Sequence, residues 1–272
     1  MLSWIGTAFS RKPDYEDGPR TRYGWVRDLP DFRDYHKTFQ EFSETPSVDL
    51  RHKCPGVYNQ GSLGSCTANA IAGAYEFDMM SQGEEAIFTP SRLFIYYNER
   101  AMEGTVPTDS GAQIRDGIKS IGNQGIVPES EWPYDINSFT TKPSPALYAE
   151  AKGHTAVKYS RVVQDIKHIK QALVEGYPVV FGFSVYESFE TEEVAKTGIM
   201  PMPEKSEQLL GGHAVMAVGY DDEQERVIVR NSWGDSWGDK GYFYMPYVFI
   251  SDGGLASDFW IVQKVNDSGP LK

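Results

Sequence analysis

The feature that most constrains the fold is a change of residue pattern near the middle of the chain. Before it, three runs at residues 65–80, 91–102 and 111–121 carry apolar residues at helical spacing. From about residue 154 onward, β-branched and aromatic residues alternate in short runs separated by glycines and charged turns, with one helical pattern at 165–175. The sequence therefore predicts an α+β protein, with a helical lobe at about 60–150 followed by an antiparallel β lobe at about 151–265.

The first 45 residues differ from both lobes. They are polar, mixed in charge and interrupted by prolines, so we expect residues 1–45 to form an extension before a main domain at 46–272. One part of the extension is patterned, because aromatic residues recur at helical spacing after Pro30. This predicts a short amphipathic helix that lays an aromatic stripe on the main body, made of Phe32, Tyr35, His36, Phe39 and Phe42.

Charge and cysteine content exclude several classes of protein. The formal net charge is −12 and the acidic residues are spread along the chain, which argues against nucleic acid or an anionic membrane as a partner. No apolar run is long enough to span a bilayer, and the opening MLSWIGTAFSRK lacks the features of a signal peptide, which leaves the compartment open between cytoplasm and non-classical release. The two cysteines permit at most one disulfide, so stability must come from the core.

Cys66 stands where a cysteine becomes reactive. A glycine-rich approach, NQGSLGS, delivers it to the first turn of the Ala-rich helical run. Free backbone N–H groups and the positive end of the helix dipole favour thiolate over thiol at that position, so we expect a lowered pKa. A cysteine at a helix start is more often a packing residue, and a nucleophile would also need a base.

His213 and Asn231 supply a candidate base and its partner. His213 begins an alternating run, Asn231 closes the next run, and the acidic turn 221–225 predicts that the two runs are neighbouring strands. The amide oxygen of Asn231 can then orient the imidazole as a base and afterwards as an acid. Taken singly, the histidine is compatible with a structural role and the asparagine with a turn.

The combination of these three residues is more specific than its parts, and it resembles a known family. The active-site blocks of papain-like (C1 family) cysteine peptidases are matched by Gln60–Cys66, by Gly212-His213-Ala214-Val215 and by Asn231-Ser232-Trp233-Gly234. The resemblance covers about residues 46–264. It implies a two-lobe fold, with a helical left lobe, an antiparallel β-barrel-like right lobe and the active site in the cleft between them.

The resemblance also implies residue roles. Cys66 would be the nucleophile, His213 the general acid/base and Asn231 the residue that orients it, while Gln60 would complete the oxyanion hole with the backbone N–H of Cys66. On the substrate side we expect the backbone of Gly111 to pair with an extended peptide, Trp233 to shield the His–Asn pair, and Gly212 to border the substrate. No cofactor is implied.

Two of the positions that depart from the family pattern lie close to the nucleophile. Leu63 stands where the family has a cysteine, so the usual disulfide is missing, and Thr67 replaces the aromatic residue that follows the nucleophile. Neither change removes a catalytic group.

The N-terminal extension carries a second resemblance. The run YGWVRDLPDFRD is similar to the short leader of some bacterial papain-like peptidases, such as xylellain, in which the leader lies across the cleft. We therefore expect residues 20–45 to cover the site and restrain the enzyme as an intramolecular inhibitor, in the manner of a zymogen. The alternative is that the aromatic stripe only covers an apolar patch.

Three functions fit these patterns. The first is a cysteine endopeptidase acting on proteins or peptides through an acyl-enzyme thioester. The second is an acyltransferase or transpeptidase using the same thioester, and the third is a binding module on a catalytically retired fold. A metal site is not predicted, because the acidic cluster at 221–225 fits a solvated hairpin tip and no Cys/His cluster has zinc spacing.

Overall fold

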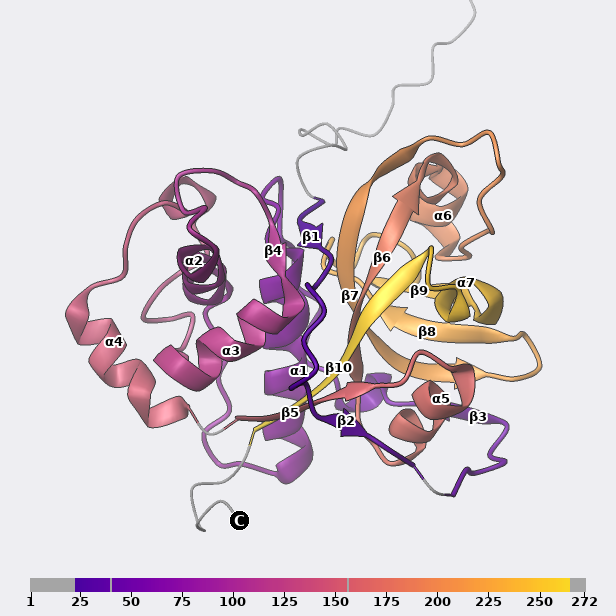
Figure 1. The fold of residues 1–272 in the computed structure, drawn as a ribbon, viewed down its shortest axis with the longest axis horizontal. Helices are drawn as coiled ribbons and strands as arrows, with labels where there is room; N and C mark the ends of the chain where they lie inside the picture. The colour runs from indigo at the N-terminus through magenta and orange to yellow at the C-terminus, as the bar shows by residue number, and fades with distance from the viewer. Residues whose placement is uncertain (1–22, 40, 156, 265–272) are drawn as a thin grey trace, which may run out of the picture.

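A computed structural model describes residues 23–39, 41–155 and 157–264. Figure 1 shows a helical part and a sheet part side by side, with the N-terminal segment running between them. The longer elements of the helical part are α1 (Cys66–Gln82), α2 (Arg92–Glu103), α3 (Ile114–Gln124) and α4 (Pro145–Ala151). The sheet part is flanked by α5 (Ile166–Val174), α6 (Glu192–Thr197) and α7 (Tyr247–Ser251). Short 3₁₀ turns lie at Arg51–Lys53, Ile136–Ser138, Lys152–His154 and Glu187–Glu190.

The main sheet has eight strands in the order β2-β5-β10-β6-β7-β8-β9, with β3 paired to β7. Its strands are β2 (His36–Lys37), β3 (Ser47–Asp49), β5 (Val157–Val162), β6 (Val179–Tyr186), β7 (Leu209–Asp221), β8 (Arg226–Arg230), β9 (Tyr242–Pro246) and β10 (Ala256–Lys264). All pairings are antiparallel except that of β2 with β5. A separate pair joins β1 (Trp25–Val26) to β4 (Ala112–Gln113) in parallel.

The helices and the hairpin expected from the sequence are present, with ends shifted by a few residues. Ser91 caps α2 by accepting a hydrogen bond from the backbone of Phe94, and Asp165 caps α5 in the same way from Lys167. The acidic turn after Asp221 joins β7 to β8 as neighbouring antiparallel strands. The α+β fold class is therefore confirmed.

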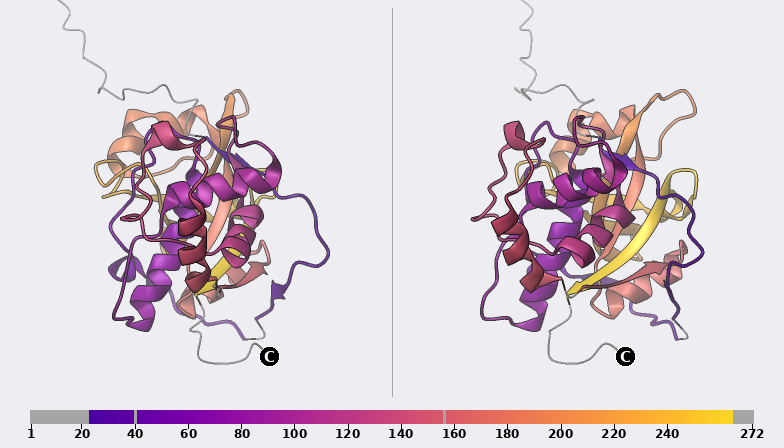
Figure 2. Two further views of the ribbon diagram at one scale, coloured as in Figure 1. Left: turned by 90° about the vertical axis from the view of Figure 1, so that its left-hand side faces the viewer. Right: turned by 60° about the vertical axis from the view of Figure 1, so that its left-hand side comes forward.

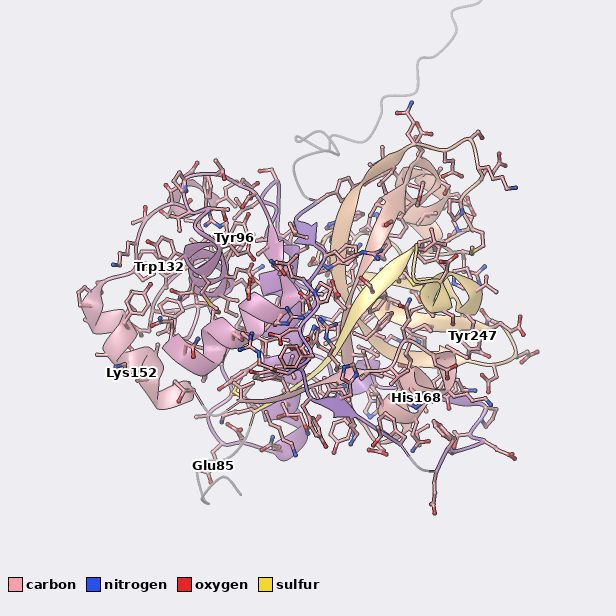
Figure 3. The ribbon with its side chains drawn as sticks, viewed as in Figure 1. Glu85, Tyr96, Trp132, Lys152, His168 and Tyr247 are labelled. Carbon is pink, nitrogen blue, oxygen red and sulfur yellow. The ribbon has the colours of Figure 1, made fainter. Side chains whose placement is uncertain are left out.

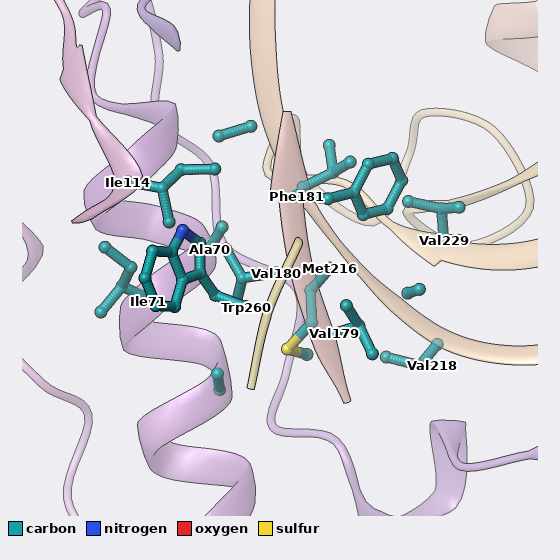
Figure 4. Close-up of a cluster of buried hydrophobic side chains, with 14 of the residues drawn as sticks. Ala70, Ile71, Ile114, Val179, Val180, Phe181, Met216, Val218, Val229 and Trp260 are labelled. Atoms are coloured by element: carbon teal, nitrogen blue, oxygen red, sulfur yellow. The ribbon is translucent and has the colours of Figure 1, made fainter. Parts of the chain in front are cut away.

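One large buried core joins the two parts. Helix α1 is apolar on nearly all sides, as is typical of a helix covered from every direction. In Figure 4 its Ala70 and Ile71 lie beside Trp260 of β10 and Ile114 of α3, and Val180 continues the cluster into the sheet. Figure 3 shows side chains from both parts filling the space between them. The sheet and α1 therefore hold fixed positions relative to each other.

The predicted amphipathic helix after Pro30 is wrong. The segment turns at Asp31, whose backbone oxygen accepts from Asp34, and then forms β2 along the edge of the sheet, where the backbone N–H of Arg161 donates to Tyr35. The aromatic stripe is not buried as a unit, because Phe32 is 99% exposed while Phe39 is buried. Backbone pairing with an open sheet edge outweighs helical periodicity in a segment this short. Gln40 lies outside the described residues.

The described N-terminal residues cross the front of the molecule at the junction of its two parts in Figure 1, and the turned views of Figure 2 show them along its right-hand edge. We call its described residues, 23–39, the leader. Strand β1 of the leader pairs with β4 on the helical side and lies against β6 and β7 on the other. The leader thus covers the line where α1 meets β7. Within the described part of the chain, no helix is both long and apolar enough to cross a bilayer.

Candidate active site

Cys66 is the first residue of α1 and is completely buried. Its Sγ is hydrogen-bonded to the backbone of Ala214, the residue that follows His213 on β7, and to the backbone of Gly24 in the leader. Both bonds lower the pKa of the thiol, so the backbone groups act as donors to sulfur. The sulfur therefore touches the strand of the predicted base on one side and the leader on the other.

His213 and Asn231 meet through a short hydrogen bond. His213 Nε2 lies 2.8 Å from Asn231 Oδ1, and the backbone N–H of Ser232 donates to the same oxygen at 2.8 Å. An amide oxygen carries no proton, so Nε2 must be the donor. The neutral imidazole consequently keeps its lone pair on Nδ1, and Asn231 selects the tautomer of the ring.

Trp233 fixes the ring plane of the histidine. Its indole stacks on the imidazole of His213, with centroids 4.9 Å apart and an interplanar angle of 27°. Behind it, Trp237 and Phe189 pack edge-on against the indole at 5.1 and 5.6 Å. This aromatic cluster keeps water from the His–Asn bond and limits rotation of the imidazole.

Gln60 approaches the site from the loop before α1 and is completely buried. Its Nε2 donates to the backbone oxygen of Leu63 at 2.9 Å, and its Oε1 accepts from the hydroxyl of Ser232 at 2.7 Å. The amide is thereby held from both ends. Ser232 links this amide to Asn231, because its hydroxyl donates to Gln60 and its backbone N–H donates to Asn231.

The expected lowering of the Cys66 pKa is not found, since burial raises the pKa to about 12. Glu99, a buried carboxyl on α2 that accepts a hydrogen bond from Thr67, acts in the same direction. The position of Cys66 at a helix start predicted a lowered pKa, but the sequence could not show that Gly24 covers the sulfur. Desolvation outweighs the backbone donors, and the covered cysteine is a neutral thiol at neutral pH.

Gly24 sits in a gap that admits no side chain. A Cβ built on it would lie 1.7 Å from the backbone oxygen of Gly64. Its own oxygen accepts from the backbone of Ala112 at 2.8 Å, and a Cβ on Gly111, which has φ of +69°, would lie 2.0 Å from that oxygen. The leader is therefore pressed against Gly111, the residue expected to pair with an extended peptide.

On the sheet side the leader contacts the other expected residues. The phenol of Tyr23 lies 6.3 Å from the ring centroids of both His213 and Trp233. A Cβ on Gly212 would lie 2.4 Å from the backbone oxygen of Trp25. The structure thus brings together the predicted catalytic residues and both predicted substrate-binding glycines, and residues 23–25 of the leader touch this group.

Comparison with known proteins assigns the family. A model described as papain family cysteine protease matches residues 45–259. The chain belongs to the papain family of cysteine peptidases. Among solved structures it is similar to xylellain, a cysteine protease from Xylella fastidiosa, with 43% identity, a TM-score of 0.83, and coverage of 96% of this chain and all of that one.

Two relatives by sequence extend the comparison. A protein of Acanthamoeba polyphaga mimivirus described as an uncharacterized peptidase C1-like protein is 47% identical over 90% of this chain and 88% of its own length. Pro-cathepsin H of Bos taurus is 30% identical over 73% of this chain, which spans 58% of that longer protein. The papain-family match begins after the leader, whereas the match to xylellain extends over nearly the whole chain.

Several residues at the site escaped the sequence reasoning. Ser232 was quoted only as part of a motif, although it joins Gln60 to Asn231. Gly24 and Trp25 lay inside a run noted for its similarity, with no role assigned to either. For metals, the described residues contain no group of three or more His, Cys, Asp or Glu side chains arranged to hold an ion.

Proposed function

We propose that this peptidase is an endopeptidase that cuts peptide bonds through a thiolate–imidazolium pair of Cys66 and His213 and an acyl-enzyme thioester. One observation carries the proposal. Asn231 holds His213 of β7 in place, and the Cys66 sulfur is hydrogen-bonded to the backbone of Ala214, the next residue of the same strand. Once the leader is displaced, the sulfur regains solvent, and thiolate becomes accessible next to an imidazole whose Nδ1 can take the proton.

Each protein group has a defined task in this reaction. The Cys66 thiolate attacks the substrate carbonyl carbon, and negative charge develops on its oxygen. The backbone N–H of Cys66 and the held amide of Gln60 supply donors for that charge. The His213 imidazolium then gives its proton to the leaving nitrogen, the C–N bond breaks, and water, deprotonated by His213, hydrolyses the thioester.

We also propose that the leader inhibits the enzyme. Three contacts support this role: Gly24 bonds the nucleophilic sulfur, Tyr23 approaches His213 and Trp233, and β1 occupies the backbone edge of β4. The leader turns an N–H of Gly24 toward the sulfur, whereas attack requires a carbonyl carbon at that place. Its docked conformation therefore blocks substrate without presenting a bond to be cut.

The peptidase proposal is tested by incubating the full chain, and a Cys66→Ala variant, with a denatured protein substrate and identifying new termini by mass spectrometry. We expect internal cuts by the first chain and a rate lower by roughly 10⁴ for the second, because loss of a nucleophile costs about 10⁶ and the docked leader already slows the full chain about a hundredfold. Equal rates would refute the proposal. A nucleophilic amine added to the assay distinguishes hydrolysis from acyl transfer, because a transferase would yield ligated products.

A further inference from the structure

A buried guanidinium joins the two segments that supply the proposed oxyanion donors. Arg92 is the first residue of α2 and is 7% exposed. Its Nη1 donates to the backbone oxygen of Asn59 at 3.1 Å and to Oδ1 of Asn69 at 3.0 Å. Asn59 directly precedes Gln60, and Asn69 lies in the same turn of α1 as Cys66. One side chain therefore contacts the surroundings of both donors.

On the side of the nucleophile, the contact continues to the peptide group that carries the N–H of Cys66. Asn69 Nδ2 donates to the backbone oxygen of Ser65 at 2.9 Å, and the backbone N–H of Asn69 donates to the same oxygen at 3.0 Å. This oxygen belongs to the peptide bond between Ser65 and Cys66. Bonds to a peptide oxygen orient the peptide plane and polarise its N–H. Asn69 thus holds the backbone oxyanion donor, and Arg92 holds Asn69.

On the side of Gln60, a tyrosine stacked on the guanidinium completes the attachment. The guanidinium carbon of Arg92 lies 4.0 Å from the ring centroid of Tyr134, whose hydroxyl donates to the backbone oxygen of Gln60 at 2.9 Å. Burial raises the pKa of Tyr134 to about 12, so the phenol keeps the proton that it donates. Arg92 and Tyr134 thereby hold two successive backbone oxygens, those of Asn59 and Gln60.

The guanidinium is itself fixed by a carboxylate from the segment after α3. Glu129 accepts from Nε of Arg92 at 2.8 Å and from Nη2 at 2.7 Å, a two-bond geometry that sets the plane of the guanidinium. Nη1 is then left to point at Asn59 and Asn69. A lysine could not take over this arrangement, because its donors diverge from one atom and cannot bridge three separate partners in a plane.

Resting on the proposed peptidase function, we propose that Arg92 is a positioning residue that sets the spacing between the Gln60 amide and the backbone N–H of Cys66. A donor acts fully only within hydrogen-bonding distance of the charge that develops in the transition state, and a displacement of about 1 Å can cost about a hundredfold in rate. We expect Arg92→Lys to lower kcat by about thirtyfold and to change KM by less than about twofold, because the lost interaction belongs to the transition state.

The test measures kcat and KM on a fluorogenic peptide for Arg92→Lys and for a matched control. Both variants are made in the full chain and in the full chain carrying Gly24→Val, whose side chain would clash with the backbone beneath the leader. Arg226→Lys is the control, because the guanidinium of Arg226 also donates to two backbone oxygens, those of Met200 and Tyr244. We expect the control to keep kcat within about twofold of its parent chain.

Alkylation of Cys66 by iodoacetamide separates placement of the oxyanion donors from a general loss of the site. The thiolate displaces iodide from a CH₂ group, so no negative charge develops on a carbonyl oxygen and the oxyanion donors have nothing to stabilise. We expect Arg92→Lys to be alkylated at a rate within about twofold of its parent chain while peptide turnover falls. An equal fall in both rates would mean that Arg92 supports the nucleophile or the fold, and it would overturn the proposal.

A double-mutant cycle asks whether Arg92 acts through Gln60. Gln60→Ala removes the side-chain amide, so its placement no longer matters, and Arg92→Lys added to that chain should cost less than about threefold in kcat. The full cost in the Gln60→Ala chain, an unchanged kcat in the single variant, or a rise in KM alone would overturn the positioning proposal and leave the peptidase proposal standing. Absence of Cys66-dependent cleavage in every chain would refute the peptidase proposal, and the positioning proposal with it.

Glu129→Gln keeps the test decisive if melting temperatures show that Arg92→Lys does not fold. It loosens the guanidinium without emptying its place, because a glutamine cannot accept both N–H groups of the arginine. We expect a fall in kcat of about fivefold, again with KM and the alkylation rate of Cys66 unchanged. Parallel losses in turnover and alkylation would count against the positioning proposal here as well.

Discussion

The proposed catalytic groups and the leader beside them are held by partly different kinds of contact. His213 on β7 and Phe183 on β6 lie in the middle of the sheet, in a buried aromatic cluster with Trp233 and Phe189. The leader also buries Trp25 and Phe39, but it adds two-residue strands and a set of hydrogen bonds and ion pairs to the body. Aromatic packing does not titrate, whereas ion pairs do, so the site can stay assembled under conditions that release its cover.

Three ion pairs of the leader, made by Asp28 and Asp34, form one network whose side chains are at most 15% exposed. Arg161 contacts Asp28, Asp34 and Asp258 at 2.9, 2.7 and 3.5 Å. Arg115 adds a pair with Asp34 at 2.6 Å, and its backbone N–H donates to Asp28. Removing one member of such a network leaves a buried charge without its partner, which is costly. Docking of the leader is thus sensitive to single changes in a way that the aromatic cluster is not.

The largest expected effect comes from a side chain at Gly24. Gly24→Val places carbon atoms on the backbone of Gly64, a clash that no rotamer relieves, so the leader should leave its place. We expect peptidase activity of the full chain to rise by about a hundredfold, measured as kcat/KM on a fluorogenic peptide. Gly56→Val is the control, because a Cβ at Gly56 meets nothing within 4 Å. An unchanged rate in a folded Gly24→Val chain would mean that the leader does not inhibit.

Acidity should strengthen docking of the leader. Burial, and next the charge of Asp258, raise the pKa of Asp28 from 3.8 to about 6. The docked carboxyl therefore holds its proton more tightly than the free one. The contribution of Asp28 to the stability of the docked leader is complete below about pH 4 and is lost as the pH rises through 6. A shift of about 2 pKa units corresponds to at most about a hundredfold weaker docking near pH 7.

The measurement is the rate of proteolytic cleavage of the leader by an added protease of different specificity, followed between pH 4 and 7.5. Cleavage of the wild-type leader should accelerate with rising pH beyond the change in the added protease itself. Asp28→Asn removes the titrating group and should flatten that dependence. The idea fails if both chains show the same profile. Cys66 should also weaken docking of the leader as the pH rises. Burial raises the pKa of its thiol in the docked state, so its thiolate forms more readily when the leader is away.

A smaller effect is expected inside the site. Ser232→Ala removes the hydroxyl that holds Gln60 Oε1 but leaves the backbone N–H that serves Asn231. In the Gly24→Val background we expect kcat to fall by about tenfold with little change in KM, because Gln60 acts mainly on the transition state. Ser232→Thr keeps a hydroxyl and should restore most of the rate. A rise in KM alone would place Ser232 on the substrate side.

Much of this arrangement could be predicted from local patterns. The change from helical spacing to alternation predicted the two parts, and helical spacing predicted the helices to within a few residues of their ends. Local patterns also predicted that Cys66 begins a helix, that His213 lies on a strand and that Asn231 follows the end of the next one. The acidic turn after Asp221 makes these two strands, β7 and β8, neighbours. These features depend on residues close together in the chain.

The tertiary structure decided the rest. The segment after Pro30 has helical spacing, yet it is extended because an edge of β5, far along the chain, offers backbone partners. The pKa of Cys66 rises although its helix start suggests the reverse, because Gly24 buries it. Asp258 carries no motif, and only the bulge in β10 turns it toward Trp25. Periodicity and motifs record what neighbouring residues favour, whereas burial and pairing depend on which distant segments the fold brings together.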